Sequence, residues 1–321
     1  MSRVTRVAAI DCGTNSIRLL VADVEGGTLR DVVRRSEVVR LGQDVDRTGR
    51  LAPDALARTL GMARQYAAVC REQGVATVRF VATSATRDAA NREQFATGVR
   101  DALGVEPEVV SGTEEAELSF LGATSTLGHA RPAATDDGTV GGAPFCVVDL
   151  GGGSTEVVVG TTRPDAAWSM DVGSVRLTER LLRTDPPTPD ETAAATATVD
   201  AALDEALAHV PVATVRTLVG LAGSVTTVTA HALGLARYDR TRIDGAVLSV
   251  DQVLAACDDL LRRTVAQRAA LGFMHPGRAD VIGAGALVWS RVVRRVAAES
   301  GVRHVVTSEH DILDGIALSL A

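Results

Sequence analysis

The sequence predicts an α/β protein of two duplicated domains, each a mixed sheet flanked by helices. Two observations carry this prediction. Three strands followed by alternating helices and strands are expected twice along the 321 residues, a length that suits two domains of ordinary size. An acid-and-glycine motif also repeats, because the stretch from Ile10 to Ser16 aligns with the stretch from Val148 to Ser154. A chance pairing of two glycine turns is less favoured, since the strand pattern repeats with it.

The second copy of this motif, residues 147–159, reads as a β-hairpin. A β-branched run enters it, three glycines form the turn, and a second β-branched run leaves it. Consecutive glycines remove side chains from a turn, so backbone N–H groups can approach a phosphate closely. The predicted phosphate-binding residues here are Gly151, Gly152, Gly153, Ser154 and Thr155. The alternative is a tight glycine hairpin with two solvated acids.

Those acids, Asp149 and Glu156, stand at either end of the loop. Carboxylates beside a phosphate repel it unless a cation lies between them, so we expect them to hold Mg²⁺, although another divalent cation would also serve. In the first copy Asp11 ends a strand in the same way, and we expect it to hold the metal directly or through water.

The turn after Asp11 offers an amide and a hydroxyl, Asn15 and Ser16, that can donate to phosphate oxygens. The predicted phosphate-binding residues of this turn are Gly13, Thr14, Asn15 and Ser16. The alternative is an Asn-Ser turn whose side chains satisfy their own backbone.

Elements of the first half follow from turn and cap signals. Gly26-Gly27 separates two strands, and Pro53 begins a helix whose apolar spacing continues until Gly74 stops it. The expected strands are 4–12, 17–24, 29–40, 75–83 and 105–110. The expected helices are the one that begins at Pro53 and is stopped by Gly74, and those over about 88–102 and 113–127.

The second half begins after residues 128–144, which lack periodicity and are expected to form a loop at the domain boundary. The expected strands are 145–150, 154–160, 166–172, 214–221 and 302–306. The expected helices are 174–183, 190–208, one after Gly223-Ser224, 251–270, 278–299 and 310–320. The predicted domains are residues 1–127, completed by the C-terminal helix at about 307–321, and residues 128–306. A ligand cleft is expected between them.

Composition excludes several function classes. All 33 basic residues are arginine, so a Walker-type P-loop and a Schiff-base lysine are excluded. A net charge of −7 argues against a nucleic-acid partner. Four scattered cysteines are expected to be buried thiols in a reducing cytoplasm, and no segment suits a secretory signal or a membrane span. The cysteines are Cys12, Cys70, Cys146 and Cys257.

A duplicated α/β chain with two phosphate hairpins resembles the actin-like ATPase superfamily, whose domains have a ribonuclease-H-like fold. Four motifs narrow the resemblance to the exopolyphosphatase and guanosine pentaphosphate phosphatase (Ppx/GppA) family. They are residues 9–16, 111–116, 149–156 and 276–280, and they span most of the chain in the family's order.

The resemblance implies roles for further residues. Glu115 matches the family's general base, with Glu114 as the alternative, although acids also favour a first helical turn for dipole reasons alone. Arg87 matches a phosphate-binding arginine; it could instead pair with Asp88 or Glu93. The turn at Gly223 and Ser224 matches a segment that contacts nucleotide in the superfamily, yet many ordinary strand–helix turns look the same. A homodimer is also implied.

These motifs predict an exopolyphosphatase that hydrolyses the terminal phosphoanhydride of polyphosphate by Mg²⁺-assisted attack of a water activated by Glu115. Short chains are the expected substrate, because the extra C-terminal domains of long members are not seen. Leu313 stands where the family pattern suggests arginine, so one arginine of the usual set is expected to be missing. Alternatives are a guanosine pentaphosphate 5′-phosphohydrolase, a guanine-nucleotide sensor with little turnover and, less favoured, a sugar kinase.

Overall fold

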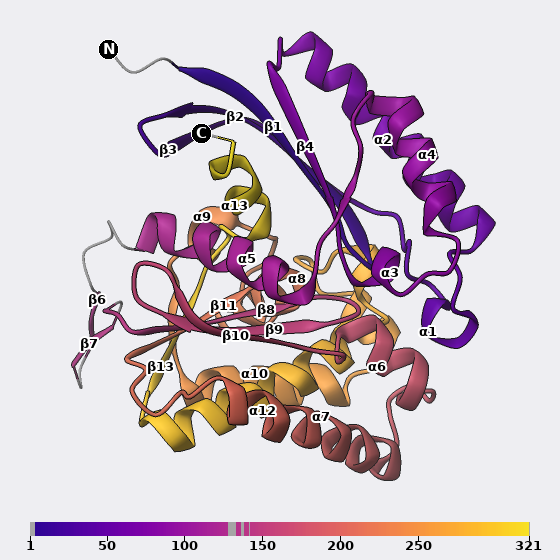
Figure 1. The fold of residues 1–321 in the computed structure, drawn as a ribbon. Helices are drawn as coiled ribbons and strands as arrows, with labels where there is room; N and C mark the ends of the chain where they lie inside the picture. The colour runs from indigo at the N-terminus through magenta and orange to yellow at the C-terminus, as the bar shows by residue number, and fades with distance from the viewer. Residues whose placement is uncertain (1–3, 128–132, 136–137, 141, 321) are drawn as a thin grey trace. The chain divides into compact units, whose positions relative to one another are not determined.

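The computed structural model describes residues 4–127, 133–135, 138–140 and 142–320. The chain divides into two compact units. Unit 1 comprises Met1–Ser125 together with Ile312–Ala321, and unit 2 comprises Thr126–Asp311. Each unit is a mixed sheet flanked by helices, as the sequence predicts (Figure 1). The α/β fold class is therefore confirmed.

The sheet of unit 1 has the strand order β3-β2-β1-β4-β5. The first three strands form an antiparallel meander, and β4 and β5 continue the sheet in parallel with β1. The bounds are β1 Thr5–Cys12, β2 Ser16–Glu25, β3 Thr28–Val38, β4 Thr77–Ala82 and β5 Glu108–Val109.

Helices cover both faces of this sheet. Alternate residues of β1 point to opposite faces, so Ala8 and Ile10 pack with α2 and α4 while Val7 and Ala9 pack with α5 and α13. Both sets are fully buried, which explains why residues 7–10 of β1 are an uninterrupted apolar run. The helices are α1 Val45–Thr48, α2 Pro53–Glu72, α3 Ser84–Arg87, α4 Arg92–Leu103, α5 Gly112–Leu127 and α13 Ile312–Leu318.

The sheet of unit 2 repeats the same plan in the order β10-β9-β8-β11-β13-β12. Its first three strands again form an antiparallel meander, β11 and β13 run parallel to β8, and β12 adds an antiparallel edge. The bounds are β8 Phe145–Leu150, β9 Thr155–Gly160, β10 Pro164–Met170, β11 Thr217–Leu221, β12 Val247–Ser249 and β13 His304–Thr307.

One large apolar cluster packs this sheet against its helices, and it includes the fully buried Trp289. The helices are α6 Ser174–Leu181, α7 Pro189–His209, α8 Ala222–Ala232, α9 Arg240–Ile243, α10 Val250–Arg262, α11 Val265–Ala269 and α12 Ile282–Ser300. No helix among the described residues combines the length and apolar character that crossing a membrane requires.

Several expected elements were wrong in part: the helix expected at 88–102 begins at Arg92, the strand expected at 105–110 is only Glu108–Val109, and three others differ as follows. The expected helix 251–270 is two helices, because Thr264 caps α11 through a reciprocal capping box with Gln267. The helix expected at 278 begins at Ile282, after a 3₁₀ turn at Pro276–Arg278.

The third lies in the expected loop 128–144. Two of its segments, β6 Ala133–Thr135 and β7 Gly138–Val140, pair as antiparallel strands. Residues 128–132, 136–137 and 141 of this stretch lie outside the described chain.

Candidate active site

The glycine motif of unit 2 is the predicted hairpin. β8 and β9 pair antiparallel with Asp149 opposite Glu156, and the amide of Gly151 donates to the carbonyl of Ser154 at 3.0 Å. A hairpin rather than a strand-to-helix turn forms because β-branched residues resume at once after the turn.

The carbonyls of this turn are held by the first turn of α6. Ser174 N donates to Gly151 O at 3.1 Å, and Val175 N donates to Gly152 O at 2.8 Å. A Cβ on Gly173 would lie 2.5 Å from the carbonyl of Gly152, so only glycine permits this approach.

The amides of the same turn differ from its carbonyls in their hydrogen bonding. Among the described residues, no backbone acceptor is found for the N–H of Gly152 or Gly153. The turn therefore presents donors of the kind that bind phosphate oxygens. The hydroxyl of Thr155 is already used, because it donates to Val172 O at 2.6 Å, and Ser154 is buried. Phosphate binding by these two side chains stays a prediction.

Asp149 and Glu156 bring two carboxylates together on facing strands. Both residues are buried, with 7% and 1% of their surfaces exposed, and directly opposite residues hold their Cβ atoms about 5 Å apart. Ser169 Oγ donates to Glu156 Oε1 at 2.7 Å and orients that carboxylate. Two oxygen ligands beside a phosphate-binding turn fit Mg²⁺, which proteins hold through one or two carboxylates plus substrate phosphate. No cluster of three or more potential ligands occurs among the described residues.

The glycine motif of unit 1 forms a hairpin of the same design. Gly13 N donates to Ser16 O at 2.9 Å, and the carbonyls of Thr14 and Asn15 accept from backbone amides of residues 39–42. The hydroxyl of Thr14 shares a 2.9 Å hydrogen bond with Ser84 Oγ at the start of α3. The turn is thereby tied to the helix that carries Arg87.

The acid of this first hairpin has a cationic partner. Arg18 lies opposite Asp11 and donates from Nε and Nη2 to Asp11 Oδ2, at 2.9 and 2.6 Å. Asp11 is buried, and the guanidinium supplies the positive charge that the carboxylate needs there. Metal binding by Asp11 stays a prediction. Arg18 was missed, although counting outward from the turn would have placed it opposite Asp11.

Glu115 and Glu114 point to different surroundings at the start of α5. Glu115 is buried, with 8% exposed, and its Oε2 lies 3.3 Å from Arg87 Nη1, which also donates to Val110 O. The Glu114 side chain is 45% exposed and pairs with Arg79 on β4. Both carboxylates contact an arginine, but only that of Glu115 is enclosed, so burial favours Glu115 over Glu114 as the candidate base. Arg87 therefore contacts Glu115, while Glu93 pairs with Arg100.

The turn at the start of α8 contains Gly223 and Ser224 and lies under an arginine. Arg278 Nη1 donates to Thr227 Oγ1 at 3.0 Å, and a Cβ on Gly223 would lie 2.1 Å from Arg278 Nη2. Ser224 faces α12, since a Cβ on Gly285 would lie 2.5 Å from its Oγ. Arg278 is a candidate phosphate ligand to which the sequence motif at residues 276–280 assigned no role.

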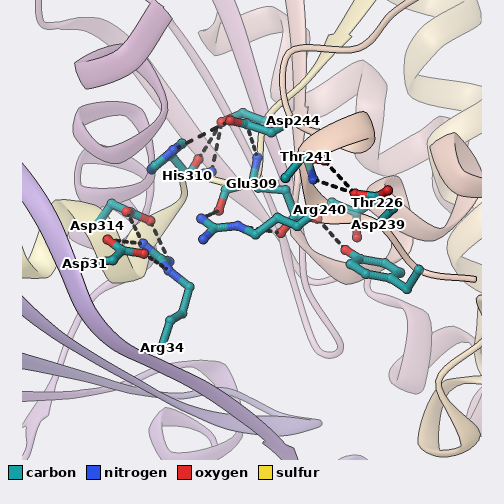
Figure 2. A network of polar contacts seen from close by, with 12 residues as sticks. Asp31, Arg34, Thr226, Asp239, Arg240, Thr241, Asp244, Glu309, His310 and Asp314 are labelled. Carbon is teal, nitrogen blue, oxygen red and sulfur yellow. Dashed lines mark hydrogen bonds and ion pairs between the residues drawn. The ribbon is translucent and has the colours of Figure 1, made fainter.

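Unit 2 also contains a polar network that was missed, and it joins residues in and around α9 to Glu309, which follows β13 (Figure 2). Tyr238 Oη donates to Glu309 Oε1, and Arg240 lies 3.5 Å from the other carboxylate oxygen. Asp244 accepts from the backbone N–H of Glu309 at 2.9 Å. Burial raises the pKa of Glu309, although Tyr238 and Arg240 lower it.

The four cysteines are buried free thiols, as predicted. Burial raises the pKa of Cys70 to about 11 and that of Cys146 to about 12. Burial likewise raises the pKa of Cys12 and Cys257. Because the thiolate is the reactive form, nucleophilic catalysis by these residues is disfavoured.

Comparison with known proteins identifies the family. Residues 20–320 match the model of the Ppx/GppA phosphatase family. The chain belongs to this family. Exopolyphosphatase 2 of Mycobacterium tuberculosis is 50% identical over 99% of both chains.

Solved structures agree with the assignment to the Ppx/GppA family. The crystal structure of an exopolyphosphatase-like protein superposes with a TM-score of 0.93 at 49% identity, covering 99% of this chain and 98% of the other. The Aquifex aeolicus family member superposes with a TM-score of 0.79 at 29% identity, over 99% and 98%. The two units are therefore the actin-like domains of this family.

Proposed function

We propose that the protein is an exopolyphosphatase that releases orthophosphate from the end of inorganic polyphosphate. Two kinds of observation support this. In the described chain, the glycine turn of β8–β9 has two amides for which no backbone acceptor is found, and they lie next to two buried carboxylates in sequence, which suits a phosphohydrolase. The full-length relative at 50% identity is named an exopolyphosphatase, and this name favours polyphosphate over other phosphoanhydrides.

In the proposed reaction the oxygen of water attacks the terminal phosphorus and the bridging P–O bond breaks. The shortened polyphosphate leaves with the electron pair of that bond. Glu115 accepts the proton of the water, a contribution of about 10²–10⁴-fold when a general base is well placed. Its burial at the start of α5 excludes competing solvent from the carboxylate.

The remaining residues bind and orient the phosphates. The amides of Gly152 and Gly153 donate to phosphate oxygens, and Arg87 and Arg278 offer guanidinium groups to the chain. Asp149 and Glu156 hold Mg²⁺, whose charge neutralises phosphate oxygens when it is bound.

The test is phosphate release from polyphosphates of defined lengths, from guanosine pentaphosphate and from ATP. We expect Glu115→Gln to lower kcat on polyphosphate by at least about 10²-fold. Glu117→Gln is the matched control, because Glu117 lies on the same helix and is exposed. Equal kcat for wild type and Glu115→Gln would remove Glu115 as the base. If guanosine pentaphosphate were hydrolysed faster than every polyphosphate, it would become the assigned substrate in place of polyphosphate.

A further inference from the structure

The last helix of unit 1 lies against the helix that carries Glu115. α13 buries Ile312, Leu313 and Ile316 on the sheet face that also receives Leu118 of α5. An arginine at position 313 would enter this apolar cluster, so Leu313 is a packing residue of α13. The two helices thus share one core although nearly the whole of unit 2 separates them in sequence.

Gly315 is a point of close approach between α13 and α5. A Cβ there would lie 1.9 Å from the carbonyl oxygen of Leu118 and 2.7 Å from its carbonyl carbon. Both atoms are backbone, so no side-chain rotation relieves the contact, and one helix has to move. Leu118 follows Glu115 by three residues, which places both on one side of α5. A shift of α5 at Leu118 therefore carries Glu115 with it.

Charged contacts fix α13 from its other sides. Arg34 of β3 donates to both carboxylate oxygens of the fully buried Asp314, at 3.1 and 2.5 Å, and also to Asp31 (Figure 2). Burial alone would lower the pKa of Arg34, but the two carboxylates raise it overall. A fork bound at two oxygens sets the orientation of α13 as well as its depth.

A third contact joins the beginning of α5 to Ser319, the residue after α13. Arg79 of β4 donates to Glu114 Oε1 at 3.1 Å and to Ser319 Oγ at 2.7 Å. The first turn of α5 is thus held to α13 through Arg79, and Leu118 is held through Gly315.

We propose that Gly315 is a positioning residue for the reaction, with Asp314 in support: they set the place of α5 and so the distance of Glu115 from the attacking water. This inference rests on the proposed function, in which Glu115 is the general base. Neither residue touches the reacting atoms; both act through the α5 backbone.

The test compares wild type, Gly315→Ala, Glu115→Gln and the double variant, with kcat and KM measured on one polyphosphate. We expect Gly315→Ala to lower kcat by about 10- to 100-fold, the loss that follows an ångström-scale misplacement, and to leave KM nearly unchanged. In the Glu115→Gln background it should cause no further loss, because the base it positions is gone. Gly61→Ala is the matched control, since its Cβ in the middle of α2 meets no heavy atom within 4 Å.

Four outcomes would overturn the inference. A loss that adds fully to that of Glu115→Gln, or one that appears in KM, would show general damage while leaving the proposed base in place. An unchanged kcat in Glu115→Gln would remove both the base and its positioning residue. If Gly315→Ala does not fold, the Asp314→Asn variant, which keeps the shape of the side chain, takes its place in the comparison with Glu115→Gln. A wild-type kcat in Asp314→Asn would also count against the proposal.

Discussion

The hairpins β1–β2 and β8–β9 share one design but carry different charges. In each, an acid is the last residue but one of the first strand. The first glycine of the turn donates to the carbonyl three residues later, at 2.9 Å in one hairpin and 3.0 Å in the other. The residue opposite the acid differs: Arg18 faces Asp11, whereas Glu156 faces Asp149. Duplication has kept the backbone while giving one hairpin an ion pair and the other two carboxylates. Of the two, the second hairpin is thus the better candidate for a metal.

The largest expected effect breaks the ion pair of the first hairpin. Arg18→Met leaves the carboxylate of Asp11 buried without its guanidinium, and we expect a loss of about 3–5 kcal/mol in the free energy of unfolding. Glu156→Gln should act in the opposite sense without Mg²⁺, gaining about 0.2–1 kcal/mol as like charges on facing strands are relieved. Urea denaturation in the presence of chelator measures both. Equal losses in the two variants would erase the proposed difference between the hairpins.

The next effect concerns the metal itself. Asp149→Asn should raise the Mg²⁺ concentration for half-maximal phosphate release more than Ser169→Ala, which removes only the hydrogen bond to Glu156. For Ser169→Ala we expect about a 10-fold increase, the lower end of what losing such a supporting contact costs. Asp11→Asn tests the other hairpin and should leave the Mg²⁺ requirement unchanged. If Asp11→Asn raised the Mg²⁺ concentration for half-maximal phosphate release more than Asp149→Asn, the metal site would be assigned to unit 1 instead.

A smaller effect is expected from the difference in space around the first glycine of each turn. A Cβ on Gly151 would lie 3.1 Å from Ser154 O, whereas a Cβ on Gly13 meets nothing closer than Ser16 O at 3.7 Å. We therefore expect Gly151→Ala to lower the melting temperature and the activity, and Gly13→Ala to change the melting temperature little. Thermal unfolding and phosphate release on the two variants check this, and the reverse order would contradict it.

The smallest expected effect is a pH dependence of stability caused by Glu309, a largely buried acid of unit 2 outside the β8–β9 hairpin. The pKa of Glu309 is raised above its ordinary value of 4.5 by burial, so the folded protein binds this proton more tightly than the unfolded chain. Its contribution to stability is complete below pH 4.5 and is lost as the pH rises through the raised pKa. Wild type should thus lose stability relative to Glu309→Gln on going upward from pH 4.5. Parallel pH curves for the two proteins would refute the assignment.

Local patterns allowed the sequence to predict the two meanders. β-Branched runs around glycine turns fix the hairpins, and the repeated motif indicated that both sheets begin alike. The break between α10 and α11 was predictable in principle, because Thr264 and Gln267 have capping-box spacing. It was obscured by apolar residues that continue the helical period on both sides.

Contacts between distant segments could not be predicted in this way. Nothing near Arg87 in sequence indicates that it meets Glu115, and nothing near Gly315 indicates a helix backbone against it. These contacts depend on how α3, α5 and α13 pack on one sheet, and single positions do not encode that packing. The acid pair of the second hairpin could be predicted from the sequence, because the strand register alone brings Asp149 opposite Glu156.

The closure of unit 1 by α13 also has a consequence for synthesis on the ribosome. The sheet and α5 of unit 1 emerge early, yet the apolar face built from Val7, Ala9 and Leu20 receives its final cover only from residues 312–318. All of unit 2 is translated in between. The unit that begins first is therefore completed last, and a nascent chain arrested within unit 2 carries an uncovered apolar surface, the kind of intermediate that chaperones recognise.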